Sequence, residues 1–298
     1  MSQVRLNNAN SSENKLVAFV GPTASGKTQA ALDLAKIIPS EIICADSRTV
    51  YKELDIGTAK PTAEDQSRIP HYGLDLVSPG EKYSVADFVI CAEGALRDIW
   101  ARNKTAILVG GSGLYIDAIL FGYKFRNQAR DIKDWEKYSN DELMQLAKKL
   151  YPGAINTIDV KNTRRLQQLI LRGPTNTSDR ESLKYEVKII GIDPGLENQQ
   201  IRIEKRTDNM LGQGFVQECD NLIKKYGKDC PTLQTTGYSA VAEYLTGKQD
   251  LDTMRRQIIT DTKRLAKKQR TWFRRNSLIT WVRDENTAID MAVSYLSK

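Results

Sequence analysis

The sequence predicts an α/β protein with a parallel sheet of the P-loop NTPase type, flanked by helices and carrying a small inserted helical domain. An apolar strand runs into a glycine-rich loop with the pattern GxxxxGKT, and a helix-forming segment follows this loop. Further apolar strands alternate with helical segments along the chain, as parallel sheets require. A change to charged, weakly periodic helical sequence over residues 123–186 predicts the inserted domain.

The first strand is predicted over Val17–Val20, and the loop that follows it reads GPTASGKT. Glycines let backbone N–H groups point at an anion, and the next helix, predicted over Gln29–Ile38, presents its positive N-terminal end there. The predicted phosphate-binding residues are Gly21, Pro22, Thr23, Ala24, Ser25, Gly26, Lys27 and Thr28, called the phosphate loop below. The hydroxyl of Thr28 is a candidate Mg²⁺ ligand. The pattern predicts a site for a diphosphate or triphosphate without identifying the molecule that carries it.

At 298 residues the chain is long enough for one large elaborated domain or for two domains. Residues 15–122 and 187–298 are predicted to form the core, and the polar residues 1–14 a disordered tail. The sequence lacks an apolar run near 18 residues, which excludes a membrane-spanning helix. Four widely spaced cysteines and a single histidine, His71, argue against a structural zinc site and predict reduced thiols in a cytoplasmic protein.

The net charge of +7 is by itself a weak indication of polyanion binding, but the distribution of charge is more informative. Nine basic residues and one acid lie between Arg255 and Arg275, a segment called the basic stripe below. Aromatic residues interleaved with the cations near its end suit stacking and phosphate contact with looped RNA. The alternative is a helix with one buried face and one solvated face.

A second strand, predicted over Glu41–Ala45, ends on Asp46. Ligands of open parallel sheets bind beyond the carboxyl ends of the strands, so Asp46 is expected in the same crevice as the phosphate loop. There the carboxylate could hold Mg²⁺, act as a general base or cap the next helix. A strand over Tyr72–Val77 is predicted next, and a capping box beginning at Ser84 predicts a helix that ends near Asn103.

The strand that follows, beginning at Thr105, ends in Gly110, Gly111 and Ser112. NTPases with this loop usually place an Asp after such a strand to hold Mg²⁺, so its absence weakens a kinase interpretation. Ser112 is predicted to be a second anion contact, and the alternative is a tight strand-to-helix turn. A strand over Val187–Ile192, helices from Ile201 to Tyr226 broken at 212–214, and a helix ending near Gly247 complete the core.

Seven motifs in this order resemble those of the tRNA dimethylallyltransferases of the bacterial type, from Val17 to Arg275. They are the phosphate loop, Asp46-Ser-Arg48, Asp55-Ile-Gly-Thr-Ala-Lys-Pro61, Tyr83-Ser-Val-Ala-Asp-Phe88, Val109-Gly-Gly-Ser-Gly-Leu-Tyr115, Arg202-Ile-Glu-Lys-Arg206 with Met210, and Lys267 through Arg274. The resemblance implies transfer of a dimethylallyl group from its diphosphate to N6 of the adenosine 3′ to the anticodon, with Mg²⁺. It also implies that the phosphate loop holds the isoprenoid diphosphate and not ATP.

The resemblance further implies the roles of individual residues. Asp46 would take the proton from N6, while Thr23, Ser112 and Arg206 would help to stabilise the departing diphosphate. The implied tRNA contacts are Asp46, Ser47, Arg48, Thr49, Arg164, Arg165, Gly237, Tyr238, Lys267, Lys268, Gln269, Arg270, Thr271, Trp272 and Arg274. The expected partners are a tRNA anticodon arm and dimethylallyl diphosphate, and the expected state is a monomer without membrane association.

The chain departs from the family's pattern at three places that bear on tRNA binding. Ser239 and Gln168 stand where basic residues are frequent, and the segment between Gly122 and Pro152 is short. A weaker contact with the anticodon arm is therefore expected. Ser112 replaces a frequent Thr but keeps the hydroxyl.

Other functions remain open at this point. An adenylate isopentenyltransferase would share the phosphate loop and the base but would act on a free nucleotide, which the basic stripe and inserted domain argue against. A small-molecule kinase is weakened by Gly110 and Gly111 at the strand end. A catalytically silent RNA-binding module or an ATP-driven switch is disfavoured by the presence of Lys27, Asp46 and Arg206 together.

Overall fold

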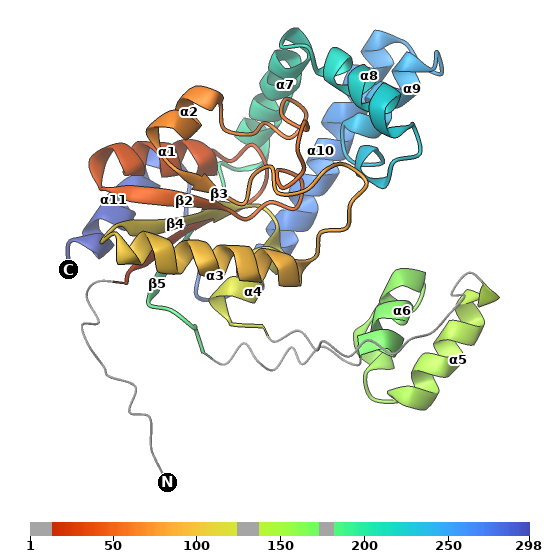
Figure 1. Cartoon of the computed structure of the whole chain (residues 1–298), viewed down its shortest axis with the longest axis horizontal. Coiled ribbons are helices and arrows are strands. Elements are labelled where there is room, and N and C mark those ends of the chain that lie inside the picture. Colours follow the sequence, from red (N-terminus) through yellow and green to blue (C-terminus); the bar gives the residue numbers. More distant parts are fainter. Residues whose placement is uncertain (1–13, 124–136, 173–181) are drawn as a thin grey trace. The chain divides into compact units, whose positions relative to one another are not determined.

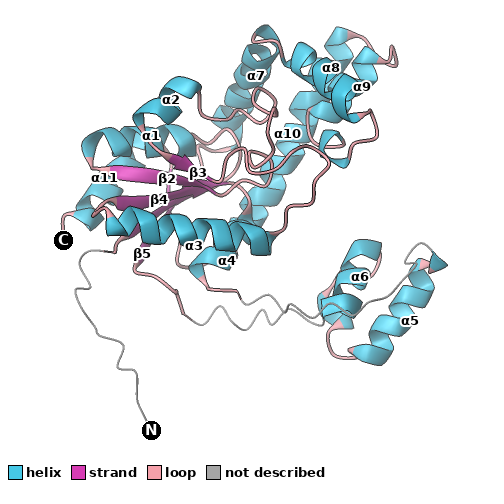
Figure 2. Cartoon of the chain, in the orientation of Figure 1, coloured by secondary structure: helices cyan, strands magenta, loops and turns pink. Residues whose placement is uncertain are grey.

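A computed structural model describes residues 14–123, 137–172 and 182–298. Its centre is a parallel six-stranded sheet in the order β3-β2-β4-β1-β5-β6, with helices on both faces (Figures 1 and 2). The predicted fold class is confirmed. The predicted tail falls on residues 1–13, outside the described residues, apart from Asn14.

The strand β1 (Leu16–Val20) lies between β4 (Thr105–Gly110) and β5 (Val187–Ile192) and is completely buried. This position explains its continuous apolar sequence, because both of its faces are covered by helices. Beyond β4 lie β2 (Ser40–Cys44) and the two-residue β3 (His71–Tyr72). The carboxyl ends of β1, β2 and β4 therefore meet at one edge, where the phosphate loop, Asp46 and Ser112 follow them.

The helices α1 (Lys27–Ile37) and α11 (Glu285–Leu296) pack together against one face of the sheet. Figure 1 shows α3 (Val85–Ala101) along the opposite face, where the short α4 (Gly113–Leu120) packs beside it. The predicted capping box at Ser84 is confirmed, since its side chain accepts from the Asp87 N–H and the Asp87 carboxylate accepts in return. A short helix, α2 (Ala63–Arg68), precedes β3.

The prediction of a strand over Tyr72–Val77 is wrong in its extent. Gly73 and Asp75 have φ angles of 83° and 53°, which are incompatible with extended backbone. A side chain at Gly73 would also meet the Cys44 carbonyl, 2.6 Å from the position of its Cβ atom. The segment therefore leaves the sheet after β3, and only Val77 returns, to an isolated bridge with Tyr51.

The C-terminal part of the core is helical. The helices α7 (Leu196–Gly212), α8 (Phe215–Tyr226), α9 (Tyr238–Leu245) and α10 (Leu251–Phe273) surround a second apolar cluster centred on Phe215 and Tyr238. A 3₁₀ turn, η4 (Pro231–Leu233), lies between α8 and α9. The chain then adds β6 (Thr280–Val282) and α11, neither of which was predicted from the sequence.

Residues 121–182 form a separate compact unit by their contacts. In the part that the structure describes, α5 (Asn140–Leu150) and α6 (Thr163–Arg172) pack together, with the 3₁₀ turn η2 (Ile155–Thr157) beside α5. The predicted apolar face of α6 is confirmed, because Leu166, Leu169 and Ile170 are all buried in the cluster between these helices.

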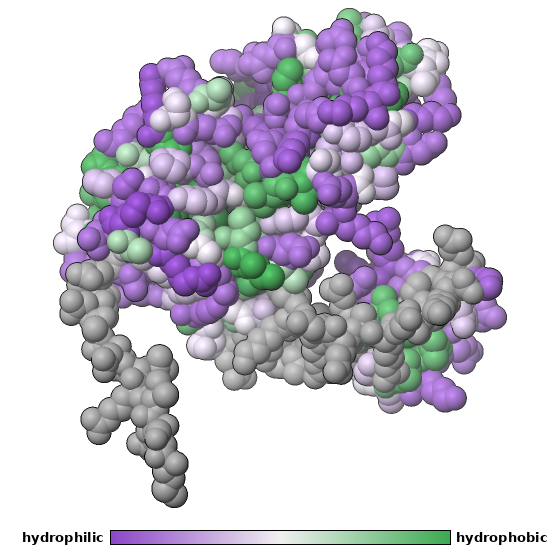
Figure 3. All heavy atoms as spheres, viewed as in Figure 1, coloured by the Kyte–Doolittle hydropathy of each residue, from purple (hydrophilic) through white to green (hydrophobic). Residues whose placement is uncertain are grey.

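Hydrophilic side chains cover most of the surface of the core that Figure 3 shows, with an apolar area between them. Among the described helices, none combines the length and the apolar composition that crossing a bilayer requires.

Replacing Gly21 by alanine tests the start of the phosphate loop. Gly21 has φ 138°, and an added Cβ atom would lie 2.4 Å from the Ile192 carbonyl oxygen. We expect Gly21→Ala to lower the free energy of unfolding by about 1–3 kcal/mol, measured by urea denaturation. The control is Gly212→Ala at the end of α7, where nothing lies within 4 Å of the added atom. An equal loss in both variants would contradict this account.

Candidate active site

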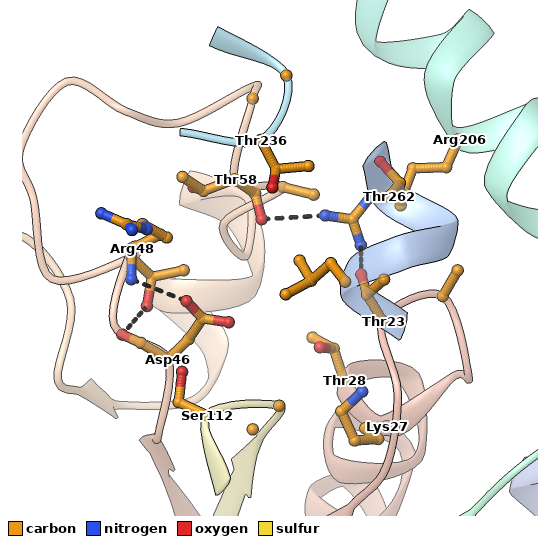
Figure 4. Close-up of a pocket in the computed structure, with 18 of the residues that line it drawn as sticks. Thr23, Lys27, Thr28, Asp46, Arg48, Thr58, Ser112, Arg206, Thr236 and Thr262 are labelled. Carbon is orange, nitrogen blue, oxygen red and sulfur yellow. Dashed lines mark hydrogen bonds between the residues drawn. The ribbon is translucent and has the colours of Figure 1, made fainter. Parts of the chain in front are cut away.

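A cavity of ≈ 560 Å³ lies at the carboxyl edge of the sheet. The phosphate loop, the segment after β2, the turn after β4, the loop around Thr58, and helices α7 and α10 all contribute to its wall. Figure 4 shows Lys27 and Thr28 on one side, Asp46 and Ser112 facing them, and Arg206 entering from α7. The structure thus brings together every residue that was predicted to act in catalysis.

The phosphate loop has the backbone that an anion cradle requires. Ala24 and Gly26 both have positive φ angles, 59° and 95°, and Gly26 directly precedes α1. Gly26 has no side chain that could cap the helix, so the first N–H groups of α1 are left free to face the cavity. The Nζ atom of Lys27 donates to the Pro22 carbonyl at 2.5 Å and to the Ser25 hydroxyl at 3.3 Å.

Two cationic side chains share this cavity. Burial, together with the smaller effect of the Arg206 charge, lowers the pKa of Lys27 to about 7, while the charge of Asp46 acts in the opposite sense. Burial also lowers the pKa of Arg206, and Asp46 again opposes the shift. Both cations thus lie where their charge is poorly solvated, so an anion of high charge would be bound strongly.

Asp46 follows β2 and is half-buried, with its carboxylate toward the cavity in Figure 4. Its Oδ1 atom accepts from the Arg48 N–H at 2.8 Å. The Ser47 N–H donates to the Ser112 hydroxyl at 3.0 Å, and the Ser112 N–H donates to the Ala45 carbonyl. Ser112 therefore joins the ends of β2 and β4 and fixes the backbone beside Asp46, in addition to lining the cavity.

The loop around Thr58 is held by a residue that sequence reasoning missed. The Glu218 carboxylate on α8 accepts from the N–H groups of Asp55, Ile56 and Gly57 at 3.0, 2.7 and 3.0 Å, and from the Tyr238 hydroxyl at 2.7 Å. The Thr58 carbonyl then accepts from Arg206 Nη2 at 3.2 Å. Glu218 thus positions the loop that orients Arg206. The sequence around Glu218 has the pattern of an ordinary amphipathic helix and does not indicate this role.

The residues of the basic stripe divide between two faces of α10. Lys267, Lys268 and Thr271 are exposed, as is Arg274 just after the helix, although Arg274 Nη2 also lies 3.7 Å from the Asp193 carboxylate. Arg270 is buried, and its guanidinium makes a bidentate ion pair with Asp193 at 2.8 and 2.9 Å. The expectation of a tRNA contact by Arg270 is therefore corrected, because this side chain lies on the face of α10 that packs against Asp193.

Other expected tRNA contacts are also partly or wholly inside the protein. Tyr238 is 1% exposed, so the expectation of an RNA contact by its side chain is corrected as well. Trp272 is half-buried and donates to Asp117 at 2.9 Å, while Gln269 accepts from the Thr23 N–H at 2.7 Å. Thr49 is buried but lines the cavity together with Ser47, Arg48 and Gly237.

The two residues that replace frequent basic residues, Ser239 and Gln168, both lie within the described part of the chain. Ser239 is half-buried and donates to the Thr235 carbonyl at 3.2 Å. In the inserted unit, Gln168, Arg164 and Arg165 are exposed on α6. The His71 ring contacts the Ile69 carbonyl through Nδ1 at 2.7 Å.

The donor set fits a metal ion that arrives with phosphate oxygens better than a resident one. Within residues 14–123, 137–172 and 182–298, there is no group of three His, Cys, Asp or Glu side chains that could hold a metal ion. Mg²⁺ is often bound by one or two protein oxygens plus substrate phosphates and water. The exposed Thr28 hydroxyl and the Asp46 carboxylate, which line the same cavity, could contribute such oxygens.

A family model described as IPP transferase matches residues 49–276, and another described as Isopentenyl transferase matches residues 14–72. The chain belongs to the IPP transferase family. The resemblance inferred from the motifs is confirmed.

Individual relatives agree with this assignment. The chain is 37% identical over 278 residues to a tRNA dimethylallyltransferase of Anoxybacillus flavithermus, covering 90% of this chain and 89% of that protein. It is 38% identical over 291 residues to a tRNA dimethylallyltransferase of a Picosynechococcus species, covering 93% and 95%.

Solved structures share the fold. The tRNA isopentenylpyrophosphate transferase of Bacillus halodurans aligns with a TM-score of 0.72 at 32% identity, covering 95% of this chain and 96% of that one. A eukaryotic dimethylallyltransferase acting on tRNA aligns with a TM-score of 0.77 at 24% identity, covering 95% and 77%, which supports the fold alone.

The lowered pKa of Lys27 predicts proton uptake when an anion binds. Above pH 7 Lys27 is largely neutral in the free protein, and a bound diphosphate would raise its pKa and favour the charged form. Proton uptake is measured by calorimetry of pyrophosphate binding at pH 8 in buffers of different ionisation enthalpy. We expect the unchanged protein to take up about one proton more than Lys27→Arg, because arginine stays charged in both states. Equal uptake in both proteins would show that Lys27 is already charged.

Proposed function

We propose that this protein transfers a dimethylallyl group from dimethylallyl diphosphate to N6 of the adenosine 3′ to the anticodon of tRNA. The observation that carries the proposal is the position of Asp46 across one cavity from the phosphate loop and Arg206. A carboxylate and an anion cradle thus line the same cavity of ≈ 560 Å³. The names of the relatives, all of which include tRNA or dimethylallyl transfer, favour this function over a kinase.

In the proposed reaction N6 attacks the C1 atom of the allyl group, the C1–O bond to the diphosphate breaks, and one proton leaves N6. Asp46 takes this proton. An exocyclic amine is a weak nucleophile, and a positioned general base is typically worth about 10²–10⁴-fold in rate. The hydrogen bond from the Arg48 N–H to Oδ1 holds the carboxylate in place at 2.8 Å.

The charge that develops on the departing diphosphate is proposed to be stabilised by the phosphate loop, Thr23, Arg206 and Ser112. Arg206 Nη1 lies 3.5 Å from the Thr23 hydroxyl, so these two donors already converge. Preorganised donors of this kind lower the barrier because they do not need to reorganise during the reaction. Mg²⁺, held by Thr28 and phosphate oxygens, would supply further charge neutralisation when it is bound.

The target base lies in a stacked loop of RNA and must be turned out of the stack to reach the cavity. The exposed cations of the basic stripe, together with Arg164 and Arg165 in the inserted unit, are proposed to contact the phosphates of the anticodon arm. This arrangement favours a tRNA acceptor over a free nucleotide, which would need no such surface. A cytoplasmic, monomeric protein is part of the same proposal.

Asp46 is tested by Asp46→Asn, which keeps an acceptor for the Arg48 N–H but removes the base. We expect turnover to fall by at least about a hundredfold while tRNA affinity stays within about twofold of that of the unchanged protein. Single-turnover labelling with dimethylallyl diphosphate measures the first quantity and filter binding the second. Near-normal turnover would exclude Asp46 as the general base.

The RNA surface is tested by replacing Lys267 and Lys268 with alanine. Loss of two phosphate contacts should weaken tRNA binding and reduce the slope of log K against log salt by about 2. The control is Lys36→Ala, Lys36 being an exposed lysine of α1 paired with Asp33. An unchanged slope would mean that these lysines form only a solvated face.

The acceptor is identified by one assay. Labelled dimethylallyl diphosphate is offered with either an anticodon stem-loop or AMP, and the labelled product is separated. The proposal requires label on the stem-loop. Label on AMP alone would identify the alternative, a free-nucleotide isopentenyltransferase.

A further inference from the structure

We propose that Gln199 and Gln269 are positioning residues that fix the backbone of Thr23, and that Arg270 acts on the diphosphate site through Gln199 and not on tRNA. This inference rests on the proposed function of the phosphate loop. It assigns a role at the diphosphate site to three side chains that belong to distant helices and touch no reacting atom.

Both polar groups of the Thr23 backbone are bonded to glutamine side chains. The Thr23 N–H donates to Gln269 Oε1 at 2.7 Å, and the Thr23 carbonyl accepts from Gln199 Nε2 at 2.8 Å. Thr23 is half-buried and lines the cavity, so water could have satisfied these groups instead. Two opposed side-chain contacts fix the orientation of a peptide segment in a way that solvent cannot.

Gln199 is itself fixed by a buried network. It is 3% exposed, and its Oε1 atom accepts from Arg270 Nη2 at 2.6 Å. The same guanidinium pairs with both carboxylate oxygens of Asp193, and the bond from Arg270 lowers the Asp193 pKa. A planar guanidinium fork satisfied in this manner leaves Gln199 one orientation, with its amide nitrogen toward the Thr23 carbonyl.

Gln269 is held by close packing against the turn after β4. A Cβ atom added to Gly111 would lie 2.4 Å from Gln269 Nε2, and one added to Gly113 would lie 2.1 Å from the Trp272 ring. Gln269 and Trp272 are one turn apart on α10, so this face of the helix rests on the glycine turn while Gln269 reaches the phosphate loop. The absence of side chains at Gly111 and Gly113 thus lets Gln269 and Trp272 pack closely against the turn.

The helix α10 therefore carries two functions on two faces. Lys267, Lys268 and Thr271 are exposed on the outer face, whereas Gln269 bonds to Thr23 and Arg270 bonds to Gln199 inside the protein. Arg270 is 8% exposed, too little for a guanidinium to reach a phosphate of a docked RNA. Its effect on the reaction must then pass through Gln199 and Thr23.

The experiment measures pyrophosphate and tRNA affinities separately in the full chain. Gln199→Met and Gln269→Met keep the side-chain volume but remove the hydrogen bond to Thr23. We expect each to weaken pyrophosphate binding about five- to tenfold by calorimetry, the value of one hydrogen bond, with tRNA affinity and its salt slope unchanged. The KM for dimethylallyl diphosphate should rise in parallel.

Gln249→Met is the matched control. Gln249 is half-buried and donates to the Ala240 carbonyl at 2.8 Å, the same type of bond just before the start of α10. It should leave pyrophosphate affinity unchanged, which separates positioning from a general loss of stability. Unchanged pyrophosphate affinity in both glutamine variants, or an equal loss in the control, would overturn the proposal.

Arg270→Lys tests the remote residue. Lysine keeps the positive charge but cannot make the bidentate bonds of the guanidinium, so we expect weaker pyrophosphate binding with unchanged tRNA affinity. Weaker tRNA binding with unchanged pyrophosphate affinity would show that Arg270 contacts RNA and would overturn its assignment. If circular dichroism shows that Arg270→Lys does not fold, Asp193→Asn, which removes the ionic partner without adding volume, makes the same comparison. Pyrophosphate binding needs no RNA or transfer, so failure of the proposed reaction would leave this result interpretable.

Discussion

Lys27 and Arg206 share one cavity in which positive charge is poorly solvated, and the rest of the site is arranged around these two side chains. Burial lowers the pKa of both Lys27 and Arg206, and the charge of Asp46 offsets this only in part. Such an arrangement persists because the surrounding backbone holds both side chains, Lys27 through Pro22 and Arg206 through Thr58. It gives the protein a site in which an allylic diphosphate would restore the balance of charge, while the carboxylate remains on the opposite wall.

Each wall of the cavity is supported from a different part of the chain. The parallel sheet brings the ends of β1, β2 and β4 to one edge, and Ser112 joins two of them. Glu218 holds the loop that orients Arg206 by accepting three backbone N–H groups. Lys60 adds ion pairs with Asp55 and Asp75, which further restrain the same loop. The reacting groups are few, and the groups that position them are many.

The cations of the basic stripe lie in two different surroundings. Its lysines at 267 and 268 are exposed, whereas Arg270 belongs to a buried network with Asp193 and Gln199. One face of α10 thus exposes lysines to solvent, while another face supports the phosphate loop through Gln269. A side chain at Gly111 would displace the amide of Gln269, and one at Gly113 would meet the Trp272 ring.

Local patterns of period and spacing were enough to predict the strand-loop-helix of the phosphate site, the strand that places Asp46, the capped helix at Ser84 and the apolar face of α6. They did not reveal the brevity of β3, the strand β6 or the roles of Glu218 and Gln199. Those roles depend on contacts across 161 residues for Glu218 with Gly57 and 176 for Gln199 with Thr23. The outward or inward direction of each cation on α10 also came from the packed fold, because the helical period fixes angles between residues but not which face meets the core.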